Sequence, residues 1–100
     1  MAIPINYLDF KSTFENTAPP IDWPEGLRSL WFAANDNWEA SHDIAQDMHS
    51  ELGSWIHGYL HRQEGDDFNA GYWYRRAGKT FPKISLEEEL RGITEFVLES

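Results

Sequence analysis

The chain has 100 residues, with 17 acidic against 8 basic side chains, a formal net charge of −9 at pH 7, and 41% hydrophobic residues that include five tryptophans. A chain of this length and apolar content forms one folded domain, and its negative charge disfavours nucleic acid and anionic membranes as partners because both carry phosphate groups. It has no cysteine, no apolar stretch near the roughly 18 residues of a membrane span and no basic, apolar leader, so we expect a cytoplasmic protein without disulfides.

The first segment, residues 1–22, has prolines at positions 4, 19 and 20. Proline removes a backbone donor and interrupts helices, so we expect an irregular arm with at most a turn of helix between Tyr7 and Phe14. The apolar residues of the segment are Ile3, Ile5, Tyr7, Leu8, Phe10, Phe14 and Ile21. Their number predicts that the arm lies across the helices that follow and covers apolar surface there.

Residues 23–78 carry the signals of two helical hairpins. In the first hairpin, Asp22 and Glu25 have the spacing of a capping box, and apolar residues at helical intervals extend to Ala34. The polar break that follows predicts a second helix, capped by Asp36.

The second hairpin begins with a helix capped by Ser50. Gly65 ends this helix, because glycine adopts the left-handed conformation of a helix end at low cost. The next helix starts at Asp66 or Asp67, and Gly78 closes it.

The helix predicted over residues 68–77 is aromatic or apolar on every side, with Arg75 and Arg76 in its last turn. Such a helix needs neighbours on several sides, which a single small chain provides poorly. We therefore expect self-association and predict a homodimer.

The C-terminal part predicts one more helix after a basic connector over residues 79–84. Ser85 and Glu88 form a capping box, and the apolar residues that follow are spaced four, three and four apart up to about Leu98. The expected fold is all-α with about five helices: two antiparallel hairpins, a C-terminal capping helix over 85–98 and the N-terminal arm.

A weak internal repeat relates the two hairpins. Moving residues 27–46 onto 57–76, an offset of thirty, superposes three identical pairs: Leu30 on Leu60, Asp36 on Asp66 and Ala40 on Ala70. These positions are the turn, the cap and the small residue that a pair of packed helices needs. In this respect the chain resembles tetratricopeptide-like helical hairpin repeats.

The stretch from Trp55 to Gly78 carries a second resemblance. Its pattern reads Trp-x-His-x-Tyr-Leu-His-Arg-x-Glu-Gly-Asp-x-x-Asn-Ala-x-Tyr-Trp-Tyr-Arg-Arg-Ala-Gly. This pattern is similar to that of a family of short, uncharacterised bacterial all-helical proteins. The resemblance implies a shared fold and no particular activity.

His57 and His61 form the first candidate site. They are four residues apart, the spacing at which two imidazoles on one helix face bind one zinc or similar ion, and Glu64 extends the same face. A third ligand could come from His42 or Asp47. The structural alternative is that both histidines are half-buried and hydrogen-bond to carboxylates or carbonyls of neighbouring helices.

The second candidate site combines arginines with aromatic residues. Its members are Arg62, Tyr72, Trp73 and Arg76, with Tyr74 and Arg75 beside them. Guanidinium groups and aromatic rings bind anionic or planar ligands through paired hydrogen bonds and stacking. The structural alternative is that the arginines pair with the acidic residues Glu39, Glu64, Asp66 and Asp67 and pack the hairpin.

Two functions remain open. The first is a non-catalytic protein-interaction module of helical-repeat type, with an aromatic-lined groove for a peptide or helix of a partner. The alternative is a small metal- or ligand-binding enzyme centred on His57, His61 and Glu64. Gly58 weakens a hydrolase reading, because it stands where the His-Glu-x-x-His motif has its glutamate base. No cofactor is expected apart from such a divalent metal.

Nucleic-acid binding is a third and weaker possibility. It needs one basic patch formed by Arg75, Arg76, Lys79 and Lys83. The net charge of −9 opposes this, so we expect no nucleic-acid partner.

Overall fold

The computed structural model describes residues 3–100, and all of their regular structure is helical. The helices are α1 (Tyr7–Lys11), the 3₁₀ helix η1 (Ser12–Glu15), α2 (Glu25–Ala34), α3 (Trp38–Gln46), α4 (Glu51–Gln63), α5 (Asp67–Arg76) and α6 (Leu86–Leu98). The predicted all-α class is confirmed, with six α-helices in the described range because α1 forms inside the N-terminal arm. No helix in this range is long and apolar enough to cross a membrane.

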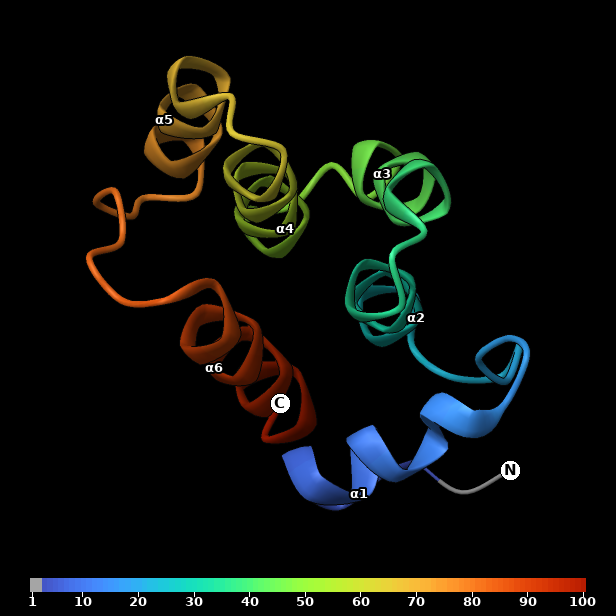
Figure 1. Cartoon of the computed structure of the whole chain (residues 1–100). Coiled ribbons are helices and arrows are strands. Elements are labelled where there is room, and N and C mark those ends of the chain that lie inside the picture. The colour runs from blue at the N-terminus through green and yellow to red at the C-terminus, as the bar shows by residue number, and fades with distance from the viewer. Residues whose placement is uncertain (1–2) are drawn as a thin grey trace.

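Two hairpins organise the fold (Figure 1). α2 packs against α3, and α4 packs against α5, as the sequence predicted. α4 also contacts α2, α3 and α6, so it is the central helix, whereas α5 lies at one end of the arrangement. The chain then returns through α6, which packs on α2 and α4 and also contacts α1, whose Tyr7 bonds to Glu87 in the first turn of α6.

The core lies where α2, α4 and α6 face one another and where the arm covers them. Its fully buried residues are Phe10, Leu27, Leu30, Ile56, Leu60 and Ile93. The side of α4 that carries Ile56 and Leu60 is buried here, because it meets α2 and α6.

The arm covers apolar surface with only part of its apolar content. Tyr7 and Phe10 are buried, and the Phe10 ring lies 6.2 Å from the ring of Trp23. The Tyr7 hydroxyl donates a hydrogen bond of 3.2 Å to Glu87 on α6. Phe14 is partly buried, with its ring 6.2 Å from the ring of Trp31. The aliphatic side chains Ile3, Ile5, Leu8 and Ile21 are exposed. The arm is therefore anchored at three aromatic residues and exposes these aliphatic ones.

The helix caps follow local rules at three positions. The side chains of Ser50, Asp66 and Ser85 accept hydrogen bonds from backbone amides in the first turns of α4, α5 and α6, and Ser85 forms the predicted capping box with Glu88. Gly65 and Gly78 adopt the left-handed conformation, with φ of 87° and 73°. These predictions are confirmed.

Two predicted caps are wrong. The N-cap of α2 is Pro24, which makes no side-chain capping bond, so the helix does not begin with the predicted Asp22–Glu25 box. The N-cap of α3 is Asn37, whose side chain accepts from the Ala40 amide at 3.2 Å. Asp36 instead takes the left-handed conformation, with φ of 63°. It therefore terminates the turn after α2 and cannot also begin α3.

The two hairpin turns have the same hydrogen bonds, but in a different register from the sequence alignment. The Asn37 amide donates to the Phe32 carbonyl at 2.9 Å, and the Asp66 amide donates to the His61 carbonyl at 2.8 Å. Asn37 and Asp66 are also the caps of the helices that follow. The turns therefore correspond at an offset of 29 residues, and the superposition of Asp36 on Asp66 is wrong by one position.

Within the single chain, α5 is covered mainly on the side that faces α4. Ala70 and Tyr74 are its buried residues, and both lie on the side that faces α4. Phe68 is 85% exposed and Tyr72 is 43% exposed. The reason is positional, because α5 stands at the end of the row of helices and has one principal neighbour.

Candidate metal centre

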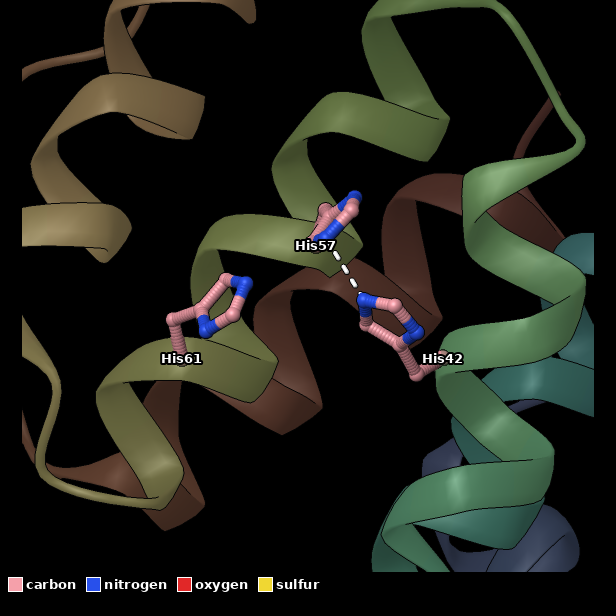
Figure 2. Close-up of side chains that lie close together, drawn as sticks. All are labelled: His42, His57 and His61. Carbon is pink, nitrogen blue, oxygen red and sulfur yellow. Dashed lines mark hydrogen bonds between the residues drawn. The ribbon is translucent and has the colours of Figure 1, made fainter.

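Three of the four histidines lie together where α3 meets α4 (Figure 2). His42 comes from α3, and His57 and His61 stand one turn apart on α4. The Nε2 atoms of His42 and His57 are 2.8 Å apart and share a hydrogen bond. One ring nitrogen from each of the three histidines lies within 4.8 Å of the other two. The structure thus brings together the three residues of the predicted metal set.

Two tryptophans fix the histidine rings. Trp38 stacks on His42 with ring centroids 4.7 Å apart, and Trp73 of α5 stacks on His57 at 3.8 Å. The Trp38 indole N–H donates to the Leu60 carbonyl at 2.8 Å, which ties this ring to α4. Aromatic packing therefore leaves His42 and His57 little freedom to turn away from each other.

Glu64 orients the third ring. Its Oε1 lies 2.8 Å from Nδ1 of His61, one turn earlier in the chain. A carboxylate at Nδ1 favours the tautomer in which Nε2 is unprotonated, which is the usual arrangement of a metal-binding histidine. Glu64 thus supports a ligand, and Asp47, the alternative third ligand, is an exposed C-cap of α3 outside the groups of converging ligand atoms found in the described residues.

The environment keeps the paired rings neutral. Burial lowers the pKa of His57 to about 4, and the neighbouring His42 and His61 add to this effect. Burial also lowers the pKa of His42, with a further contribution from His61. A neutral imidazole is the form that binds metal ions, so at pH 7 these rings need no deprotonation before they bind.

The fit to a metal requires a small adjustment. Zinc–nitrogen bonds of about 2.0–2.1 Å in tetrahedral geometry separate two ligand nitrogens by roughly 3.3 Å. His42 and His57 would move apart by about half an ångström from their present 2.8 Å. The ring that now donates through Nε2 would carry its proton on Nδ1 instead. The nitrogen of His61, which lies within 4.8 Å of the other two, would also have to take this separation.

A second group of ligand atoms is formed by His61, Glu64 and Asp66. Both carboxylate oxygens of Asp66 already accept hydrogen bonds, from the Asn69 amide at 3.2 Å and from the Asn69 side chain at 2.6 Å. These bonds cap α5 and lower the pKa of Asp66. This group is therefore explained by the helix cap.

Arg62 has a structural role. Its Nη1 lies 2.8 Å from Oε1 of Glu89, a carboxylate that is 2% exposed, and its Nη2 donates to the Ile84 carbonyl. Glu89 also accepts from the Tyr74 hydroxyl at 2.7 Å and from the Trp55 indole at 3.2 Å. Arg62 is therefore paired with an acidic residue, as the structural alternative expects, but the partner is the buried Glu89 of α6 and none of the four acidic residues named from the sequence.

The other members of the arginine and aromatic set lie on α5. The Arg76 guanidinium is 5.2 Å from the Trp73 ring centroid, and its Nη1 donates to the Tyr72 hydroxyl at 3.2 Å. Trp73 and Arg76 line a pocket of about 470 Å³ with His57. The pocket is completed by Ala45, Gln46, His49, Ser50, Glu51, Gly53 and Ser54.

The sequence interpretation missed Trp38 and Glu89. Trp38 stands four residues before His42 and therefore on the same side of the helix, which was the available signal. Glu89 lies in a run of three glutamates, which reads as a solvated face. Its position three residues after Leu86 and four before Ile93 places it on the apolar side, and this periodicity was the available signal.

Comparisons with protein-family models, with curated proteins and with solved structures find no match to this chain. They support neither the tetratricopeptide-like resemblance nor the bacterial family resemblance. The class that the fold and the site define is a small all-α protein with three converging histidines between its hairpins.

Proposed function

We propose that the protein binds one first-row divalent metal ion, such as zinc, through His42, His57 and His61. The observation that carries this proposal is the convergence of the three ring nitrogens within 4.8 Å, from two different helices. Nitrogen ligands favour zinc, copper, nickel and cobalt over calcium and magnesium. Three protein ligands also leave one position of a tetrahedral ion open, as in sites that bind a further small ligand.

The surroundings of the three rings support the same proposal. Trp38 and Trp73 hold two of the rings by stacking, and Glu64 orients the third. Partners of this kind strengthen metal binding because they reduce the cost of orienting the ligands. The proposal concerns binding alone, since Gly58 replaces the glutamate that would serve as a hydrolytic base.

Calorimetric titration of zinc into chelator-treated protein without a His-tag tests this function. We expect one ion per chain, with binding weakened at least tenfold in His42→Gln and in His61→Gln. His49→Asn is the matched control, because His49 is the one histidine outside the cluster and asparagine tolerates its left-handed φ of 46°. Substoichiometric zinc, or equal losses in the cluster variants and the control, would refute the proposal.

A protein-interaction function is the second candidate, and the exposure of Phe68 and Tyr72 on α5 favours it. Large exposed aromatic side chains are typical of protein contact surfaces. We propose that this surface joins two copies of the chain. Light scattering should then give twice the mass of 11.6 kDa, and Tyr72→Ala should shift the population toward monomer. A monomer at tens of micromolar would exclude the homodimer.

A further inference from the structure

The pocket beside the histidine cluster has features that the metal proposal does not use. It has a volume of about 470 Å³, within the range of small-molecule sites. It lies at the first turn of α4 and the last turn of α5, with His57 and Trp73 as a shared wall toward the cluster. Its polar lining includes one guanidinium group and several neutral donors from serine and glutamine side chains.

His57 faces both the cluster and the pocket. Its Nε2 bonds to His42, and Figure 2 shows its other ring nitrogen on the side that points away from His42. Among the described residues this Nδ1 has no hydrogen-bond partner. Every fully buried side-chain nitrogen or oxygen of these residues does have a partner, so Nδ1 is not fully buried and solvent reaches it. His57 is 95% buried and lines the pocket, so solvent reaches its Nδ1 through the pocket.

The state of Nδ1 follows from what Nε2 does. When Nε2 accepts a hydrogen bond from His42, or coordinates a metal ion, the ring proton of neutral His57 resides on Nδ1. Nδ1 is then an N–H donor that faces the pocket without a protein acceptor. Histidines that bind metals nearly always give this second N–H to a carboxylate, a carbonyl or water.

Arg76 supplies the positive charge of the pocket. Its guanidinium contacts the Trp73 ring and the Tyr72 hydroxyl, and it has no carboxylate partner within the described residues. Arg62 and Arg91, by contrast, are paired with Glu89 and Glu95. In a chain of net charge −9, an arginine that lines a pocket without an acidic partner is available to an external anion.

We propose that this pocket binds a small monocarboxylate, held between the Arg76 guanidinium and the Nδ1–H of His57. A carboxylate has two acceptor oxygens, which suit a guanidinium and one further N–H donor. Glu51 lines the same pocket and repels a second negative charge, so a carboxylate fits better than a phosphate dianion.

The inference deepens the proposed function and rests on it in one respect. A metal ion on Nε2 would fix the proton of His57 on Nδ1, so metal and carboxylate should each strengthen the binding of the other by the same factor. Carboxylate binding by itself needs only the His42–His57 hydrogen bond with His42 as donor. The two proposals can therefore fail separately.

NMR titration with sodium benzoate at constant ionic strength tests the inference, with sodium chloride and sodium phosphate as comparisons. In the zinc-free and zinc-loaded protein, benzoate should shift the Trp73 indole and Gly53 amide signals saturably. Arg76→Gln should weaken binding about tenfold by loss of a charge-assisted bond. Arg75→Gln is the matched control, because it removes the same charge from the neighbouring residue, which does not line the pocket.

Shifts no larger than those caused by chloride would overturn the inference, as would equal weakening in the two arginine variants. Phosphate that binds as tightly as benzoate would overturn the assignment to carboxylates. Benzoate binding without any zinc binding would support the carboxylate pocket and contradict the metal site. Zinc binding without benzoate binding would support the metal site and contradict the carboxylate pocket. Equal benzoate affinity with and without zinc would contradict the coupling.

Discussion

His42 of α3 and His57 of α4 share a hydrogen bond of 2.8 Å between their Nε2 atoms, and each ring is stacked on a tryptophan. Such a bond forms only when one ring donates and the other accepts, so the pair requires two neutral rings with complementary tautomers or a single shared charge. The stacks on Trp38 and Trp73 hold the two rings in this relation. The pair thus joins the two hairpins by a polar contact, and it supplies two of the three proposed metal ligands.

Stability of the metal-free protein should fall as the pH is lowered from 6.5 toward 4. The folded-state pKa of His57 is about 4, below the ordinary 6.5, so the unfolded chain binds a proton in this interval that the folded chain does not. The stabilising contribution is complete above pH 6.5 and amounts to about 3 kcal/mol, by the conversion of pKa shift to free energy.

Urea denaturation of chelator-treated protein at pH 7 and pH 4.5 measures this change. The loss should be smaller in His57→Phe, which keeps an aromatic ring against Trp73 but does not titrate, and unchanged in His49→Asn. A pH dependence that is the same in His57→Phe and in the unmodified protein would show that another group is responsible.

Glu64→Gln should weaken zinc binding by about 10- to 100-fold, the usual effect of removing the carboxylate that orients a metal-binding histidine. The amide can still accept a hydrogen bond from His61, but it lacks the negative charge that favours the tautomer with an unprotonated Nε2. Calorimetry measures the change, with Glu51→Gln at the other end of α4 as the control. Full zinc affinity in Glu64→Gln would contradict a role of the Glu64–His61 contact in metal binding.

Glu89→Gln should destabilise the protein by about 3 kcal/mol. The carboxylate is buried and accepts hydrogen bonds from Arg62, Tyr74 and Trp55, so its removal leaves a half-buried guanidinium without its counter-charge. Urea denaturation measures the loss, and the same substitution at the exposed Glu99 should have little effect. Similar stabilities of the two variants would contradict the role of Glu89 in joining α4, α5 and α6.

Gly58→Ala should destabilise the protein, although alanine is the better helix former. A Cβ atom at this position would lie 3.2 Å from the Tyr74 ring, which is fixed by its bonds to Glu89. Overpacking of this kind costs about 1–3 kcal/mol, more than the about 1 kcal/mol gained in helix propensity. Gly92→Ala on α6 is the control, since a Cβ atom there meets nothing within 4 Å and should stabilise the helix. Thermal unfolding should show melting temperatures that shift in opposite directions.

The features predicted correctly from the sequence are those that depend on neighbouring residues. Ser50 and Ser85 cap helices because their hydroxyl groups reach amides three residues away, and Gly65 ends α4 because its neighbours in the chain require a left-handed residue. The same local chemistry gave a wrong cap for α3, because Asp36 takes the left-handed turn position and the adjacent Asn37 is the cap. Either Asp36 or Asn37 satisfies the cap rule, and the geometry of the turn decides between them.

The features that were not predicted depend on where the helices lie. The opposite faces of α4 are both covered because α4 is central, so His57 is buried instead of half-exposed. Phe68 is exposed because α5 is at the end of the row. The spacing of His57 and His61 indicated two ligands and left the third open between His42 and Asp47, and the packing of α3 on α4 brings His42 to them. Tertiary placement of this kind leaves no signal in the periodicity of a single helix.

The most direct test of the central claim is the ring ¹⁵N NMR spectrum of the four histidines during zinc titration. We predict that the signals of His42, His57 and His61 shift together and saturate at one zinc ion per chain, while those of His49 remain in place. If none of the three shifts, or if His49 shifts along with them, the three rings do not form one metal site.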